Sequence, residues 1–426
     1  MRSFGMSRYA HSAIFVLLFL ASMTPAAAQP WALTLAAAED LLRHNREILA
    51  SQRAVEGADA GVTIAGQAPN PSVSYSAVSL SPRSGIGSGG IADKRIDQTM
   101  AISQLIERGD KRELRSAAAN ALARASRSDL ADIHRQQRLA LHLAYYDLKA
   151  AAARVQSGDE TAALYRRSLE AAVLRQRVGD LAAVDVSRLR VEMLRADNDV
   201  RQAQADLIKA RWTLAYLIGQ EVRADDLVPA DDWPTPETPV LPTAPIESRP
   251  AMKAATARIE AADQARQLAR RLRTRDVTLT GQVERNRTAD PPESGVTYGV
   301  SISVPLFVRY GYEGESVKAE VDYNAALEDR DRILAQAGND AAKAQADLAA
   351  AAERLSRTNT VVLPEAQRVA AAAEFAYSKG AMALTDLLDA HRTLRAVELE
   401  GVAARADYAK ARAVWLAATE WESNTK

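Results

Sequence analysis

An internal duplication constrains this chain more than any other feature. Residues 55–59 (VEGAD) recur as residues 259–263 (IEAAD), 204 positions later, and a glycine turn at Gly179 recurs at Gly380, 201 positions later. Around these landmarks each half reads in the same order: helix, strand, strand, long helix, glycine turn and shorter helix. The fold must therefore be built from two similar units.

Two segments in each half change from helical to alternating periodicity. In the first half Val73, Tyr75 and Ala77 alternate with serines, which is typical of a strand with one apolar face. The expected strands are residues 71–81 and 96–106 in the first half, and 275–285 and 296–306 in the second. The loop between the second pair is four residues shorter. Length changes fall in loops when the flanking elements are fixed, so this placement supports the strands.

Each half also contains one very long helical run. Residues 112–178 hold no proline, and a helix of that length would span roughly 100 Å. This is longer than a globular domain needs, and it indicates a coiled coil or a tube. The second run, residues 314–379, shows a seven-residue repeat of Leu327, Leu334, Ala341, Leu348 and Leu355. Pro364 predicts a bend or an interruption within it.

The chain divides into four parts. Residues 1–28 have the charged start, short apolar core and small-residue site of a secretory signal peptide. Residues 29–220 form the first repeat and residues 251–426 the second. The connector between them, residues 221–250, contains seven prolines and is expected to be extended. No segment offers the roughly 20 apolar residues of a membrane-spanning helix, so any membrane part must be made of strands.

Composition excludes several classes of function. The chain has 54 basic and 54 acidic side chains, and loss of the signal peptide would remove two arginines and no acids. A nearly neutral chain argues against nucleic acid as a partner. Cysteine is absent, which excludes disulfides, thiolate metal ligands and lipid attachment through cysteine. The sequence shows no phosphate loop, nucleophile elbow or acid–base pair, so we expect no enzyme, no cofactor and no metal site.

Four strands with one apolar face cannot close a barrel, and open sheet edges are not tolerated in lipid. Three chains would contribute twelve strands, an even number within the range of outer-membrane barrels. The same three chains would supply six two-helix units, enough to wall a tube. The predicted fold is therefore mainly α with a membrane β-barrel: a trimeric α-helical tube joined to a shared 12-stranded barrel.

Several local motifs make a family resemblance specific. Residues 70–71 (NP), 103–104 (SQ), 109–112 (GDKR) and 304–307 (VPLF), together with the two glycine turns, resemble the TolC-like outer-membrane factor family. Residues 104–112 are most similar to the branch that serves heavy-metal efflux of the cobalt, zinc and cadmium type. The resemblance departs at the lipid-bearing cysteine, which is missing, and at residues 274–275, where relatives usually have proline.

This resemblance implies a location and a set of partners. Such proteins are trimeric exit ducts in the outer membrane, with a large periplasmic portion. They contact outer-membrane lipid and a periplasmic adaptor, or membrane fusion protein, through which they serve an inner-membrane RND-type pump. The expected function is a passive conduit for heavy-metal cations, gated at its periplasmic tip. Multidrug or type I secretion ducts remain as alternatives, as does a periplasmic coiled-coil adaptor with a single hairpin and compact β-domains.

The resemblance also implies two groups of functional residues. Adaptor docking is expected at the turns, through Arg177, Val178, Gly179, Asp180, Leu181, Lys379, Gly380, Ala381, Met382 and Leu384. A periplasmic gate is expected at Asp386 and Asp389, with Asp185 as the counterpart of Asp386 in the first repeat. The simpler interpretations are a left-handed glycine that ends a helix, and acids that complement a helix N-terminus. Arg188 occupies the position of Asp389, so the two copies are not equivalent.

Overall fold

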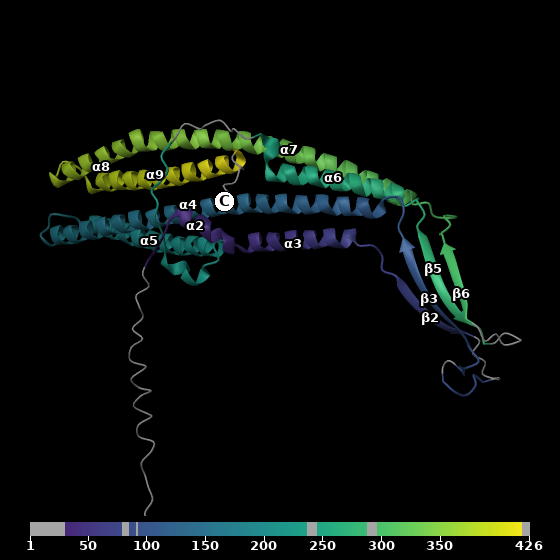
Figure 1. The fold of residues 1–426 in the computed structure, drawn as a ribbon. Coiled ribbons are helices and arrows are strands. Elements are labelled where there is room, and N and C mark those ends of the chain that lie inside the picture. Colours follow the sequence, from purple (N-terminus) through teal and green to yellow (C-terminus); the bar gives the residue numbers. More distant parts are fainter. Residues whose placement is uncertain (1–29, 79–84, 91–92, 237–244, 288–295, 420–426) are drawn as a thin grey trace, which may run out of the picture. The chain divides into compact units, whose positions relative to one another are not determined.

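The computed structural model describes residues 30–78, 85–90, 93–236, 245–287 and 296–419 (Figure 1). The expected signal peptide, most of the second hairpin loop and part of the first loop and of the connector lie outside these residues. The chain forms two compact units, and each draws on both repeats. Within the described ranges, every helix falls short of the combined length and apolar character that a bilayer crossing demands.

The first unit consists of residues 1–49, 135–241 and 341–418. It contains most of α4 (Lys111–Arg177), the end of α7 (Glu313–Arg357), and the helices α5 (Ala183–Leu217), α8 (Leu363–Ser378) and α9 (Leu384–Thr419). Its core is built largely from alanine, with a few large side chains such as Tyr145 and Tyr408 fully buried. Small side chains let helices approach closely, and this is how a chain with 5% aromatic residues packs long helices.

A small two-stranded sheet lies at one edge of this unit. Strand β1 (Trp31–Leu33) pairs in parallel with β4 (Leu227–Pro229), beside α2 (Leu35–Leu41) and the 3₁₀ turns η1 (Leu42–His44) and η3 (Glu221–Asp226). Tyr145 from α4 anchors it, because the Tyr145 hydroxyl lies 2.8 Å from the carboxylate of Asp231. The proline-rich connector is therefore not simply extended: its first residues are paired and turned, and the turn η4 (Ile246–Ser248) follows.

The second unit consists of residues 50–134, 242–340 and 419–426. Helices α3 (Arg46–Gly66) and α6 (Pro250–Arg271) lie in it beside the beginnings of α4 and α7. It also contains an antiparallel sheet in the order β2 (Ser72–Val78), β3 (Asp97–Ile106), β5 (Val277–Arg285) and β6 (Thr297–Ser303) (Figure 1). The two repeats thus meet at the β3–β5 pair. Strand β6 stops before Pro305, which has no N–H group for a sheet hydrogen bond.

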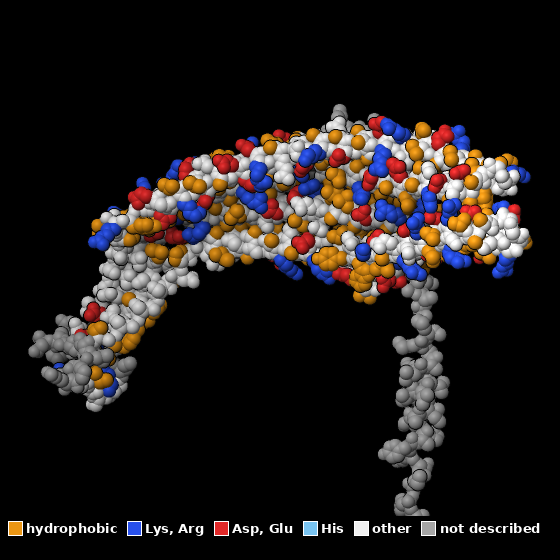
Figure 2. Space-filling view, turned by 180° about the vertical axis from the view of Figure 1, so that it is seen from behind, with side chains coloured by type: hydrophobic (Ala, Val, Ile, Leu, Met, Phe, Trp, Pro, Cys, Tyr) orange, Lys and Arg blue, Asp and Glu red, His pale blue; other side chains and the backbone are white. Residues whose placement is uncertain are grey.

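The sheet has one apolar face and one polar face, as the alternating sequence predicts. One row across all four strands is Tyr75, Met100, Val283 and Tyr298. A row on the opposite face is Ser72, Ser103, Thr280 and Ser301. Side chains of the apolar row are exposed, including Tyr75 at 57%, Met100 at 60% and Tyr298 at 79%. Figure 2 shows charged side chains spread over the helices but sparse on the sheet.

Two helical segments are interrupted. Residues 35–66 show helical periodicity and hold no proline, but the helix breaks at Asn45, whose buried side-chain oxygen accepts a hydrogen bond from the N–H of Glu47 at 3.0 Å and so caps α3. The long helix of the second repeat is divided by a π-helical turn, η5 (Thr358–Val362), directly before Pro364 in the first turn of α8. Proline lacks the N–H for the regular ladder, so Pro364 causes the interruption that the sequence predicts.

Candidate functional site

The two glycine turns share one backbone design. Gly179 follows α4 with φ +82°, and Gly380 follows α8 with φ +75°. In the first turn the N–H of Gly179 donates to Gln176 at 3.0 Å and that of Asp180 donates to Arg175 at 2.9 Å. The second turn repeats both hydrogen bonds, from Gly380 to Tyr377 and from Ala381 to Ala376. This is the Schellman motif, which needs a left-handed residue where only glycine avoids strain.

The first turn presents a charged, exposed tip. Val178 is 80% exposed, and Arg177, Gly179 and Asp180 are also exposed. The guanidinium of Arg175 pairs with Asp180 at 2.7 Å, which raises the pKa of Arg175 and holds the turn closed. Leu181 is the exception, since its half-buried side chain packs against a cluster of buried side chains below the turn.

The second turn is less charged. Lys379, Gly380 and Ala381 are exposed, and the Lys379 ammonium lies 5.5 Å from the centre of the Phe375 ring. Met382 is half-buried. Leu384 is only 6% exposed, because its side chain packs into the same buried cluster as Leu181. Leu384 therefore supports the turn from inside the unit and is not part of its exposed surface.

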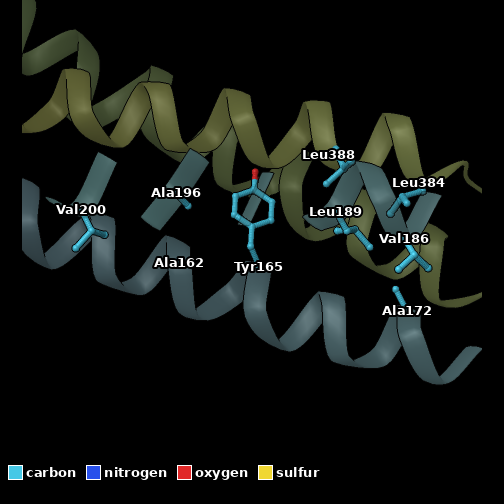
Figure 3. Close-up of a cluster of buried hydrophobic side chains, with 9 residues drawn as sticks. All are labelled: Ala162, Tyr165, Ala172, Val186, Leu189, Ala196, Val200, Leu384 and Leu388. Atoms are coloured by element: carbon cyan, nitrogen blue, oxygen red, sulfur yellow. The ribbon is translucent and has the colours of Figure 1, made fainter. Parts of the chain in front are cut away.

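One apolar cluster joins the two turns. It consists of Ala162, Tyr165, Ala172, Val186, Leu189, Ala196, Val200, Leu384 and Leu388 (Figure 3). Leu384 and Leu388 from α9 point toward Val186 and Leu189 from α5, with α4 beneath them (Figure 3). Arg175 adds a link between the turns, because its guanidinium lies 5.5 Å from the centre of the Tyr377 ring. The structure therefore brings the turns of the two repeats together at one end of the first unit.

The three predicted gate acids lie in different electrostatic surroundings. Asp185 pairs with Arg188 one turn along α5, at 3.2 Å. Asp389 pairs with Arg392 one turn along α9, at 2.7 Å. Asp386 lies exposed in the first turn of α9, and the described residues provide it with no ion pair. Asp386 and Asp389 share the start of one helix, as expected, but only Asp386 keeps an uncompensated charge within the chain.

Sequence reasoning missed the ionic link between α5 and α9. Arg392 donates to Glu192 at 2.8 Å, and Arg195 approaches Glu192 at 3.0 Å. Glu192 is 8% exposed, and the hydrogen bond from Arg392 holds its pKa below the ordinary value. Arg392 thus bridges a buried carboxylate of one repeat and Asp389 of the other. The three-residue spacing of Asp389 and Arg392 predicts an ion pair along one helix, but no local sequence pattern singles out Glu192.

A groove lies over this link, between α5 and α9. Its volume is about 480 Å³, and its lining includes Val184, Val191, Thr385 and the charged groups of Arg188, Glu192, Asp389 and Arg392. Arg392 pairs with both Glu192 and Asp389, while Arg188 pairs with Asp185. No group of three or more metal-ligating side chains is found among the described residues. The arrangement is suited to holding the two hairpins together and to presenting charge.

The family of the chain follows from its match over both repeats. The model of the outer membrane efflux protein family matches residues 37–220 and 241–417. The chain belongs to this family. It is an outer-membrane efflux channel of the tripartite type, with a large periplasmic helical portion, and not an enzyme. Channels of this family are trimeric components of tripartite pumps.

Individual relatives agree with this assignment. The chain is 26% identical to the cobalt-zinc-cadmium resistance protein CzcC of Cupriavidus metallidurans over 373 residues, which cover 85% of this chain and 84% of CzcC. Among solved structures it resembles the outer-membrane channel OprN, with a TM-score of 0.75, 20% identity and 91% of both chains covered. It also resembles VceC of Vibrio cholerae, with a TM-score of 0.73, 19% identity and 90% and 95% coverage. These structures confirm the mainly helical, TolC-like fold.

Proposed function

We propose that this outer membrane efflux protein is the exit duct of an RND-type system that exports heavy-metal cations. The observation that carries the metal assignment is the similarity to CzcC, which extends over both repeats. Residues 104–112, which resemble the heavy-metal branch, support it. The protein acts as a passive conduit, and the inner-membrane pump supplies energy and selects the substrate.

The sheet supports a homotrimer that encloses the duct. Strands β2 and β6 are the two edges of a four-stranded sheet, and each leaves a row of backbone groups unpaired within the chain. In lipid such edges must pair with another strand. Three copies would pair β6 of one protomer with β2 of the next and close a 12-stranded barrel, with the apolar rows facing outer-membrane lipid and the serine and threonine rows facing the lumen.

The two glycine turns are the proposed docking surface for the periplasmic adaptor. Their exposed residues are Arg177, Val178, Gly179, Asp180, Lys379, Gly380 and Ala381, with Leu181 and Met382 at the margin. The rigid hydrogen-bonded turn fixes these side chains before the partner arrives, which lowers the entropic cost of binding. Leu384 contributes by holding the second turn in place.

The acids beyond the turns are the proposed gate. In a trimer three copies of Asp386 would converge, with Asp389 and Asp185 nearby, and the unpaired carboxylates would attract cations. Opening requires α8 and α9 to shift against α4 and α5. Such a shift must break the Arg392–Glu192 pair and separate Arg175 from Tyr377. Adaptor contacts at the turns are placed to bias this two-state change.

The test is deletion of the gene, followed by growth on zinc, cobalt, cadmium, copper and silver beside drugs and dyes. We expect hypersensitivity to metal cations that a plasmid-borne copy restores. Hypersensitivity to drugs and dyes alone would overturn the metal assignment and favour a multidrug duct. A defect only in secretion of a protein substrate would favour a type I secretion duct.

A further inference from the structure

The segment between β6 and α7, residues 304–312, exposes apolar side chains that none of the described residues covers. Leu306 is 72% exposed, Val308 81% and Tyr310 57%. These residues follow directly after the apolar row of β6, in which Tyr298, Val300 and Ile302 are themselves 67–79% exposed. Alternate residues therefore stay apolar and exposed beyond the last paired residue, Ser303.

The segment is ordered by aromatic contacts. Tyr312 has a left-handed backbone with φ +61°, an unfavourable conformation for a bulky residue. Its ring packs edge-on against Phe307, with centroids 5.4 Å apart, and against Tyr310 at 4.9 Å. The Arg273 side chain donates to the carbonyl of Gly311 at 3.0 Å. These contacts hold the backbone of residues 304–312 in place beneath the exposed apolar side chains.

Two arginine side chains, one beside this segment and one within it, carry guanidinium groups. Arg275 lies 5.6 Å from the centre of the Phe307 ring, and Arg309 lies between the exposed side chains of Val308 and Tyr310. Within the described part of the chain neither Arg275 nor Arg309 has a carboxylate partner. Glu313 and Glu315 are near in sequence, but Glu313 approaches Arg273 at 3.9 Å and Glu315 accepts the hydroxyl of Tyr310. The two free cations stay available to an external anion.

The equivalent junction of the first repeat, residues 104–110, is built differently. Glu107 pairs with Arg115 at 2.9 Å, and the backbone N–H of Arg108 donates to Asp276 at 2.9 Å. Lys111, which is buried, pairs with the same Asp276 at 2.9 Å. Ion pairs inside the chain hold Glu107 and Lys111 at this junction, although Leu105 and Ile106 stay 37% and 47% exposed. The clearest difference is aromatic content, because residues 104–110 hold no aromatic residue whereas the second junction holds Phe307, Tyr310 and Tyr312.

We propose that residues 304–312, with Arg275, form an anchor in the headgroup region of the membrane, at the end of β6. The inference rests on the proposed placement of the sheet's apolar face in outer-membrane lipid. Aromatic rings and arginines together are favoured at a membrane interface, where rings meet acyl chains and guanidiniums meet phosphates. The occupant is a phospholipid headgroup with its upper acyl chain. The first junction lacks aromatic residues, so each protomer carries one such anchor.

The chain has no cysteine, so single-cysteine spin labels test the depth of each site without background. Labels replace Val308 (V308C), Val300 (V300C) and Val178 (V178C), which lies on the exposed tip of the first turn, in the full-length channel, reconstituted in vesicles of phosphatidylethanolamine and phosphatidylglycerol. Accessibility to oxygen and to an aqueous nickel reagent is then measured by power saturation. We expect lipid exposure at Val300, an aqueous environment at Val178, and an intermediate depth at Val308.

Other outcomes separate the two proposals. If Val300 lies in lipid but Val308 is as accessible to nickel as Val178, the anchor is overturned while the sheet placement stands. Shielding of Val308 from both reagents would show burial by a second copy of the chain and would also overturn the anchor. An aqueous Val300 would overturn the placement of the sheet itself.

A second pair of variants tests the arginines. Changing Arg275 and Arg309 to glutamine should move the Val308 label toward water in vesicles with phosphatidylglycerol, and should abolish the difference from vesicles of phosphatidylcholine alone. Arg108→Gln is the matched control and should leave the Val308 label unchanged. An unchanged lipid dependence in the double variant would contradict phosphate recognition.

Discussion

The two repeats of this channel have the same backbone at their tips but different electrostatics. Both turns use a left-handed glycine with the same two hydrogen bonds. Beyond the turn, Arg188 of the first repeat pairs with Asp185. The second repeat has Asp389 at the position of Arg188, and the part of the chain that the structure describes gives Asp386 no cationic partner. The junctions near the sheet diverge in the same way. The two repeats thus keep the glycines that the turn backbone requires, whereas the charged side chains around the turns differ and can serve different roles.

The largest loss of transport should come from replacing the left-handed glycines of the turns, which both repeats share. Valine at Gly179 or Gly380 would force a β-branched residue into a left-handed conformation, at a cost of about 1–2 kcal/mol or more, and would distort the tip. We expect metal resistance to fall to the level of the gene deletion while trimers still assemble, as measured by growth and by semi-native gels. Gly338→Val is the control, because Gly338 lies inside α7 with open space around it. Survival of transport in both turn variants would refute docking at the turns.

The next effect concerns Leu384, which corresponds to Ala183 in the first repeat. Leu384 is buried in the cluster below the turns, so Leu384→Ala should lower the free energy of unfolding by about 2–5 kcal/mol. Val178→Ala, on the exposed tip of the other turn, should leave it nearly unchanged. Thermal unfolding of the purified channel, followed by circular dichroism, measures both. Equal losses would show that the two turns are buried alike in the assembled protein.

Replacing Arg392 should lower the free energy of unfolding more than replacing Arg188, but the difference should be smaller than that between the Leu384 and Val178 variants. Arg392→Met leaves the buried Glu192 with Arg195 alone and should cost about 1–3 kcal/mol. Arg188→Met removes an exposed pair and should cost about 1 kcal/mol or less. Melting temperatures of the two variants give the comparison, and a larger loss for Arg188→Met would contradict it.

The pH dependence of the Arg392 link has a definite sign. The folded-state pKa of Glu192 lies below its ordinary 4.5, so its stabilisation is complete above pH 4.5 and is lost as the pH falls through the lower folded value. Arg392→Met should reduce this acid-dependent loss. A loss of equal size in the variant would assign the pH dependence to other carboxylates.

The smallest effect should be in conduction. Asp386→Asn removes an unpaired carboxylate, whereas Asp185→Asn removes one that Arg188 already compensates. In planar bilayers we expect the first variant to lower cation preference and raise leakiness more than the second, and Asp386→Asn with Asp389→Asn to exceed both. Unchanged conductance and cation preference in the double variant would argue against a gate at these acids.

The sequence allowed more of the fold to be predicted than of the site. The glycine turns and the alternating strands depend on residues close in sequence, so Gly179, Gly380 and the sheet could be located directly. The β1–β4 pair joins two segments of three residues from distant parts of the chain, too short to show a period. Glu192 could not be singled out, because its role depends on how α5 and α9 pack. The break at Asn45 left a signal, a capping residue, inside an otherwise regular helical pattern.

The π-helical turn η5 has a consequence for the phase of the helical packing. In α4 the buried positions 144, 151, 158, 165 and 172 keep a strict seven-residue interval toward the first tip. In the second repeat the buried positions 337, 344 and 358 fit the same seven-residue interval, which would continue at 365 and 372. After η5 the buried positions are instead 366, 370 and 373, so the pattern is shifted by one residue. In a regular helix one additional residue would rotate all that follows by about 100° and advance it by about 1.5 Å. The π-turn absorbs that residue, so α8 keeps the same face toward the core, and removing a single residue from η5 should restore the seven-residue interval without turning the second tip.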